Sequence, residues 1–330
     1  MSPAGRPDAT WTPVRAALLG SAAVALSLVL VAHPPSALLA SAFGRGEPGP
    51  PVALGREALG ASGRVRLQVR APGELFDFPL ERAGDETLRY QWVAATDSGA
   101  VSMDTALTGS TVAAPVRAGF YHLALLGDGG RTILDSLLVG VLVPFSAKFG
   151  SSLHGYRIGT YRWEREPGDA TPPPQGFLEV WPDHENLAVS AHLRVSDFLT
   201  HDDQARWPRY VALDTRILDK VELVLAYLGA PYRTMPLDVH SGFRTPLHNR
   251  HVPRAASDSR HQYGDAVDLA LDADGDGRVS YLDVLAVARA VEAVERQHPA
   301  LTGGLGIYGN RGTAAYVHID VRGQAMRWRG

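Results

Sequence analysis

The sequence predicts an α+β protein of two domains, with a β-sandwich-like domain in the N-terminal half and a domain of helices and strands in the C-terminal half. The 330 residues exceed one typical domain of ~150 residues. Residues 52–145 hold short alternating runs separated by Gly and Asp turns, whereas residues 176–330 combine helical periodicity with isolated strands. Hydrophobic residues make up 45% and charged residues 20%, which is the balance of a globular protein.

Charge and cysteine content exclude several classes of function. The net charge is −3, so the basic excess of a nucleic-acid-binding protein is missing. The chain has no cysteine, which excludes disulfides and thiolate metal sites. A bound metal would therefore need His, Asp and Glu ligands.

The N-terminal residues 1–42 predict export. An uncharged apolar run at residues 16–32 follows Arg6 and Arg15. Small residues suited to signal peptidase come next, at 40–42. The run is longer than a signal core of about 7–15 residues and shorter than a spanning helix of about 20. It is therefore predicted to be either a cleaved signal peptide or a single-pass membrane anchor. Both place the bulk of the protein in the periplasm or on the outer face of the cytoplasmic membrane.

The N-terminal half follows a Gly- and Pro-rich linker at residues 43–51. Its strand-like runs lie at 65–69, 88–93, 121–125 and 133–143, and their close spacing with turns indicates a small β-sandwich over residues 52–145. It holds no cluster of catalytic residue types. We interpret it as a structural or binding module whose partner stays open.

A second connection is predicted at residues 146–175, which end in three prolines. In the C-terminal domain, Asp214 is expected to cap a helix whose apolar residues recur at helical spacing and which ends at Gly229. Further elements are expected as strands at 237–240, 266–271 and 316–321, a loop at 241–246 and a helix at 281–296.

A metal site is predicted at two of these strands. On a strand with period two, Asp268 shares a face with small residues while its neighbours point into the core, and Gly264 lets the preceding loop bring His261 back toward it. On the last strand, His318 lies on the polar face. Two histidines and one aspartate suit catalytic zinc, because three protein ligands leave one position open.

Several motifs in this half resemble the M15 family of zinc D-Ala-D-Ala carboxypeptidases and murein endopeptidases, in the branch once labelled a domain of unknown function. They are SGFRTP at 241–246, SRH with the later Asp at 259–268, GGLGIY at 303–308 and VHID at 317–320. The resemblance covers about residues 176–330. It implies a zinc peptidase domain of mixed helices around a small antiparallel sheet, zinc on His261, Asp268 and His318, and peptidoglycan stem peptides as substrate. It further implies that Arg244 steadies a substrate carbonyl or carboxylate.

One departure concerns the general base. Many family members have Glu three residues before the last His, or His two residues before it, where this chain has Ala315 and Tyr316. Asp320, on the same strand face as His318, is the predicted replacement. The alternative is that Asp320 orients His318 or pairs with Arg322. If no base is present, the protein is an exported, metal-stabilised cell-wall-binding module without catalytic activity; a calcium-dependent adhesion protein is a third interpretation.

A second ion site is predicted at residues 272–283, whose spacing fits the twelve-residue calcium loop. Gly277 stands at the sharp turn, and Asp283 replaces the usual Glu at the last position, which predicts weaker binding. The alternative is an acidic turn that caps the helix at 281–296. We expect the loop to act as a structural clamp. Its predicted ligands are the side chains of Asp272, Asp274, Asp276, Ser280 and Asp283 and the carbonyl of Arg278.

Overall fold

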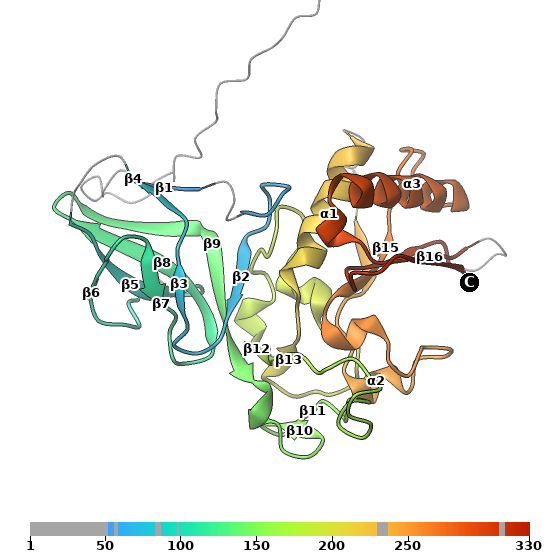
Figure 1. Ribbon diagram of the computed structural model, residues 1–330, viewed down its shortest axis with the longest axis horizontal. Helices are drawn as coiled ribbons and strands as arrows, with labels where there is room; N and C mark the ends of the chain where they lie inside the picture. Colours follow the sequence, from blue (N-terminus) through green and yellow to red (C-terminus); the bar gives the residue numbers. More distant parts are fainter. Residues whose placement is uncertain (1–51, 56–58, 83–86, 98, 230–236, 310–313) are drawn as a thin grey trace, which may run out of the picture. The chain divides into compact units, whose positions relative to one another are not determined.

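The computed structural model describes residues 52–330 except 56–58, 83–86, 98, 230–236 and 310–313 (Figure 1). The predicted export segment at 16–32 and the linker at 43–51 lie outside the described residues. Among those residues, no helix has the length and apolar character needed to cross a bilayer. The chain has a mixed α and β fold with few helices and several largely antiparallel sheets, as the sequence predicts at this level.

The longest strand, β9 (Gly130–Pro144), organises a seven-stranded sheet (Figure 1). On one side it pairs antiparallel with β8 (Gly119–Gly127), which pairs with β5 (Arg89–Ala94) and through it with β6 (Thr105–Ala106). Near its other end it pairs with β12 (Gly176–Val180), which pairs with β13 (Arg209–Val211), and along its middle it pairs in parallel with β2 (Leu67–Arg70). This sheet therefore continues from the predicted N-terminal domain into the predicted C-terminal one.

Two small hairpin-like sheets complete the N-terminal half. They pair β1 (Val52–Leu54) with β4 (Leu80–Arg82), and β3 (Leu75–Asp77) with β7 (Thr111–Ala113). A core centred on Trp92 lies beneath them, with Phe76 and Phe78 at ring-centroid distances of 6.4 Å from it. The predicted run at 88–93 alternates buried residues with more exposed ones over most of its length, whereas residues 137–143 of β9 are buried on both faces.

Residues 146–175, predicted to be a connection, are folded into the core. They carry η2 (Phe145–Ala147), β10 (Ser152–Leu153) and β11 (Tyr156–Arg157). Tyr156, Ile158 and Tyr161 are buried in the same core as the C-terminal helices. The Tyr161 hydroxyl donates to the carbonyl of Gln262 at 3.0 Å, next to a predicted metal ligand. These few buried side chains anchor the segment to the core, so it is not a solvated linker throughout, which its closing prolines did not indicate.

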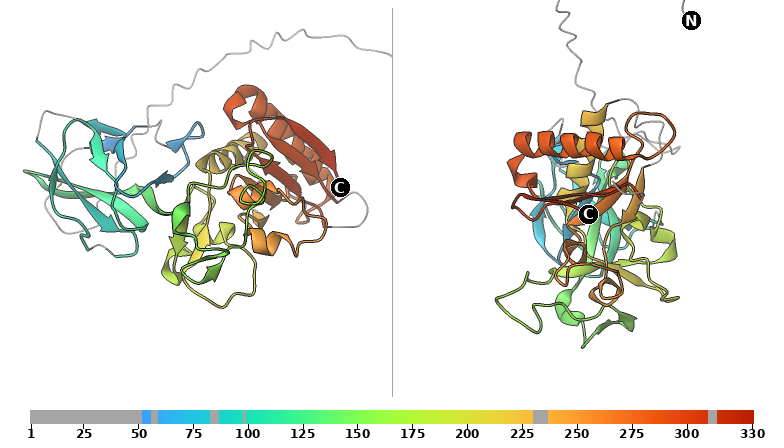
Figure 2. Two further views of the ribbon diagram at one scale, coloured as in Figure 1. Left: turned by 60° about the horizontal axis from the view of Figure 1, so that its bottom comes forward. Right: turned by 90° about the vertical axis from the view of Figure 1, so that its right-hand side faces the viewer.

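A five-stranded sheet carries two of the three predicted metal ligands, Asp268 and His318 (Figures 1 and 2). Its order is β14 (Asp238–Ser241), β15 (Ala266–Ala270), β17 (Val317–Asp320), β16 (Gly304–Ile307) and β18 (Met326–Arg329). All neighbours are antiparallel except β16 and β18. The register places Asp268 directly opposite His318 and, on its other side, opposite Ser241.

Two helices support this sheet. The helix α1 (Thr215–Leu228) begins where the Asp214 side chain accepts a hydrogen bond from the Arg216 amide and ends at Gly229, which confirms the predicted boundaries. The helix α3 (Tyr281–Gln297) packs against α1 and against β16 and β17 (Figure 2). The remaining short helices are η3 (Pro182–His184), η4 (Val195–Phe198), α2 (Pro246–Asn249), η6 (Arg260–Tyr263) and η7 (Pro299–Leu301).

A buried carboxylate ties α1 to the turn that precedes β2. The side chain of Asp219 accepts hydrogen bonds from the amides of Ala61 at 2.9 Å and Ser62 at 2.8 Å. Gly60 makes this approach feasible, since a Cβ there would lie 2.7 Å from the Asp219 carboxylate and the residue has φ +75°. One side chain thus satisfies two backbone donors that would otherwise lose their partners.

Asp219→Ala should therefore lower the free energy of unfolding by about 1–3 kcal/mol, because it leaves two partly buried amides without a hydrogen-bond acceptor. The measurement is denaturant unfolding of the full chain, with Glu292→Ala on the exposed face of α3 as the control. A loss below about 0.5 kcal/mol, the range of ordinary surface substitutions, would contradict the role of Asp219.

Candidate metal centre

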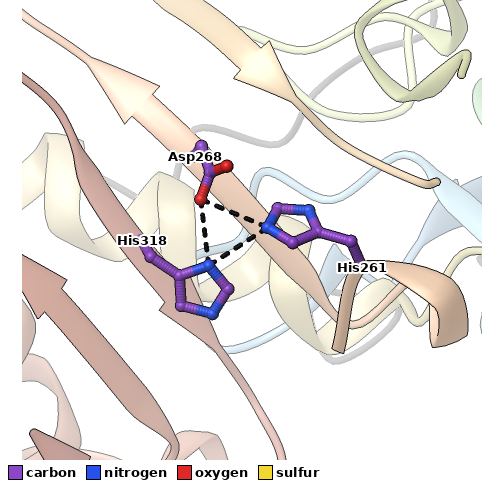
Figure 3. Close-up of side chains that lie close together, drawn as sticks. All are labelled: His261, Asp268 and His318. Carbon is purple, nitrogen blue, oxygen red and sulfur yellow. Dashed lines mark hydrogen bonds and ion pairs between the residues drawn. The ribbon is translucent and has the colours of Figure 1, made fainter. Parts of the chain in front are cut away.

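Three side chains from three segments converge beside the five-stranded sheet (Figure 3). His261 comes from η6, Asp268 from β15 and His318 from β17, and all three are buried. The Nε2 atom of His261 lies 3.2 Å from Asp268 Oδ1 and 3.1 Å from His318 Nδ1. His318 Nδ1 lies 2.9 Å from the same carboxylate oxygen. The structure thus brings together the three residues that the sequence predicted as metal ligands.

In each histidine, the ring nitrogen that faces away from the centre forms a hydrogen bond. This bond determines whether the nitrogen that faces the centre carries a proton or a lone pair. His261 Nδ1 lies 2.7 Å from the carbonyl oxygen of Gly242, which only accepts, so this nitrogen carries the proton. His318 Nε2 lies 3.2 Å from Asp320 Oδ2 and donates to it. When both imidazoles are neutral and in these tautomers, the two facing nitrogens offer lone pairs toward each other and toward a carboxylate oxygen. Three converging acceptors suit a cation, and two His with one carboxylate is a zinc ligand set.

Burial and charge shift the pKa values of these groups in opposite directions. Burial lowers the pKa of His261. Burial acts in the same direction on His318, but hydrogen bonds to Asp268 and Asp320 outweigh it and raise the pKa of that imidazole. For Asp268, burial favours the neutral acid, yet the two histidines outweigh it and hold the pKa well below its usual range. The carboxylate is therefore ionised at neutral pH.

Asp320 lies behind His318 and away from the site's cavity. Its side chain is 0% exposed and accepts hydrogen bonds from the Gly304 amide at 2.7 Å and from Arg322 Nε at 2.9 Å, in addition to His318. A general base needs an oxygen within reach of the attacking water, and these oxygens are already occupied by donors. This geometry favours the alternative, in which Asp320 orients His318 and pairs with Arg322, while its role as the base stays a prediction.

Arg244 contacts one of the three converging side chains directly. Its Nη2 lies 2.6 Å from Asp268 Oδ2, and its Nε donates to Ser241 Oγ at 2.8 Å. The guanidinium therefore holds one oxygen of Asp268 and leaves the other oxygen facing the two histidines. The sequence placed Arg244 at the site as a contact for substrate, and the structure adds this contact to Asp268.

A cavity of about 690 Å³ opens beside the three residues and has an aromatic wall. Tyr308 and Tyr316 stack at a centroid distance of 4.4 Å with an interplanar angle of 7°. Trp328 Nε1 donates to the Tyr308 hydroxyl at 2.8 Å, and the Trp328 ring lies 5.1 Å from that of His318. Burial raises the pKa of Tyr316 to about 12, so its phenol stays protonated at neutral pH.

Tyr308 and Trp328 were missed at the sequence level because their position depends on the pairing of β16 with β18. That pairing is parallel and puts Gly306 opposite Trp328. A Cβ on Gly306 would lie 2.5 Å from the Trp328 indole, so only glycine lets this ring lie against the sheet. In the sequence, the glycine at position 306 within a short strand was the one indication that a large ring lies against this strand.

The acidic loop at residues 272–283 brings part of its predicted ligand set together. Carboxylate oxygens of Asp272, Asp274 and Asp276 lie within 4.8 Å of one another. Ser280 and Asp283 instead cap α3: the hydroxyl of Ser280 accepts from the Leu282 amide, and the carboxylate of Asp283 accepts from the amides of Ser280, Ala273 and Asp274.

Arg278 also takes part in the loop through its backbone, where its amide donates to Asp276 Oδ1 at 2.8 Å. The helix-capping alternative is thus present in the structure, and calcium binding by the loop stays a prediction.

One family of known proteins has a sequence model that matches this chain. Residues 191–320, which include all three converging side chains, match the sequence model described as Peptidase M15. Among solved structures, the chain is similar to the L-Ala D-Glu endopeptidase ChiX of Serratia marcescens, at 21% sequence identity and a TM-score of 0.26. That similarity covers 34% of this chain and 83% of the other. No curated protein matches the chain.

For the acidic loop, about 1 mM calcium should raise the melting temperature of the full chain by about 2–4 °C relative to chelator, because binding to the folded state stabilises it. Asp274→Asn with Asp276→Asn should abolish this response while keeping oxygen acceptors for the turn amides. Asp135→Asn with Asp183→Asn removes two exposed carboxylates elsewhere and is the control. An unchanged response in the loop variant would exclude the loop as the calcium site.

Proposed function

Residues 191–320 of this chain belong to the M15 peptidase family, and from this we propose that the protein is a zinc-dependent peptidase that cleaves peptidoglycan stem peptides. The observation that carries the proposal is the convergence of His261, Asp268 and His318 with their lone pairs facing one another. Whether the bond cleaved is terminal, as in a D-Ala-D-Ala carboxypeptidase, or internal, as in a murein endopeptidase, is left to the digestion experiment below.

The donor set fits zinc on chemical grounds. Zn²⁺ takes imidazole nitrogen and carboxylate oxygen, and catalytic sites use three such ligands. His261 Nε2, His318 Nδ1 and Asp268 Oδ1 would hold the ion. Zinc bound there would supply a Lewis acid that polarises a peptide carbonyl.

The surrounding residues fix these ligands before any substrate arrives. The Gly242 carbonyl and Asp320 each hold one imidazole in the tautomer that presents a lone pair to the centre. Arg244 holds Asp268 from the other side. Because each ligand has its own partner, little reorganisation accompanies metal binding.

The cavity is suited to a peptide that extends past the centre. Tyr308, Tyr316 and Trp328 provide flat apolar surface, while Arg244 lines the same cavity with charged N–H donors. We propose that Arg244 also donates to a substrate carbonyl or carboxylate, which a forked and permanently charged group does well. The protonated Tyr316 phenol adds a second donor on this wall.

A second candidate function is a metal-stabilised cell-wall-binding module without turnover, and one observation favours it. Among the described residues that line the cavity, side-chain carboxylates occur only at Asp258 and Asp268. Asp268 is held by Arg244 and the histidines, and Asp258 accepts hydrogen bonds from Tyr263 and Thr171. Neither is a free proton acceptor. Both candidate functions act on the cell wall and accord with the export that residues 1–42 predict.

Digestion of purified peptidoglycan separates the two candidates. The zinc-loaded full chain should release peptides that mass spectrometry assigns to a single cleaved bond, and it should hold about one zinc per chain. His261→Ala and His318→Ala should each lose both zinc and release of products. His251→Ala, an exposed histidine whose ring contacts only the Leu247 carbonyl among described residues, is the control. Zinc content without product release in the wild type would favour the binding module.

Asp320→Asn tests the orienting role. Removal of the charge behind His318 should weaken zinc affinity by about 10–100-fold, as is typical for partners of metal-bound histidines. At saturating zinc, turnover should return to within a few-fold of the wild type, because the metal ligands themselves are intact. A loss of a hundredfold or more that persists at saturating zinc would restore Asp320 as the base.

A further inference from the structure

Among the residues that the structure describes, four arginines line the cavity, and three of them are paired with carboxylates. Arg244 pairs with Asp268, Arg260 with Asp265 and Arg322 with Asp320. In each pair the carboxylate is buried, so the charge of the guanidinium is compensated within the protein. These three side chains help to build the site.

Arg254 is the fourth, and it differs in two respects. Within the part of the chain that the structure describes, its side chain is exposed and makes no hydrogen bond or ion pair. Its backbone has φ +61°, the left-handed region that residues with a side chain seldom adopt. Only His154 shares this property among the described residues other than glycine.

The loop around Arg254 is fixed by its neighbours. The amide of Ala255 donates to the Val252 carbonyl at 3.2 Å, which closes the turn that contains Arg254. The buried Asn249 donates through Nδ2 to the Ala256 carbonyl at 2.9 Å. A strained residue persists only where surrounding contacts determine it, and such residues gather at ligand sites. Here the turn places Arg254, whose side chain is exposed and unpaired among the described residues, at the edge of the cavity.

We propose that Arg254 is a specificity-determining residue that binds a carboxylate of the substrate, so that the protein selects acidic peptides. This inference rests on the proposed peptidase function and names the chemical class of its substrate. The guanidinium fork matches a carboxylate with two parallel hydrogen bonds. The other three arginines are neutralised by protein carboxylates, which leaves Arg254 as the cavity arginine with a charge to be met from outside.

The test uses stem peptides in matched pairs. In each pair, one free carboxylate of the peptide is replaced by a carboxamide of nearly equal size. The replaced groups are the carboxylates of the glutamate and diaminopimelate side chains and those of the peptide backbone. For one position, the wild-type, zinc-loaded full chain should prefer the carboxylate by about tenfold or more in kcat/KM, the scale of a charge-assisted hydrogen bond. The difference should lie in KM, because a contact made equally with the bound substrate and with its transition state changes binding and not turnover.

Arg254→Gly is the informative variant. It should raise KM for the preferred carboxylate peptide about tenfold with kcat unchanged, and it should leave the carboxamide peptide unaffected. Because glycine adopts φ +61° without strain, the same variant should melt at a higher temperature than the wild type. Arg250→Ala removes an exposed arginine of the same loop that does not line the cavity, and should change neither preference nor KM.

Calorimetric binding of the same peptides separates this inference from the proposed function. A wild type that binds the carboxylate peptide tenfold more tightly but cleaves nothing would refute the peptidase and keep the role of Arg254. Equal binding of both peptides, or a preference that survives in Arg254→Gly, would overturn the role of Arg254 whatever the turnover.

Discussion

The pairing of β15 with β17 is the constraint on which the site depends. It sets Asp268 opposite His318, so that a carboxylate oxygen and an imidazole nitrogen meet at 2.9 Å across two neighbouring strands. A shift of one residue in this register would turn Asp268 toward the core and Val267 toward the site. The apolar faces of both strands prevent that shift, because Val267, Ile319 and their neighbours are buried against the helices.

Contacts from the helices α1 and α3 also stabilise this strand pairing. Lys220 of α1, fully buried, donates to Glu295 of α3 and to the backbone carbonyl of Asp320, both at 2.7 Å. Burial lowers the pKa of this lysine, and the carboxylate of Glu295 opposes that shift. Arg327 of β18 also pairs with Glu295. The helices and the last strand are thus joined through one charged cluster directly beneath the residue that orients His318.

The sequence was informative where the signal was local. Alternation along β15 and β17 predicted which side chains face the site, and Asp214 with Gly229 predicted both ends of α1. The sequence left two roles open for Asp320, base or partner of His318, because alternation gives the face of a residue and not the direction of a neighbouring imidazole. The same limit explains Trp328, whose position follows from a parallel pairing between β16 and β18. It also explains residues 146–175, whose buried aromatics become visible only when their packing partners are known.

Because β9 belongs to the sheet of both halves of the chain, neither half can be exchanged independently of the other. Because β12 pairs with β9, loss of the N-terminal strands would leave the backbone donors and acceptors along that side of β12 without partners. An exposed strand edge of this kind recruits other chains and promotes aggregation. The half that carries the candidate metal ligands therefore depends on β9 for its sheet, and recombination that exchanges one half without the other would have to supply a replacement strand.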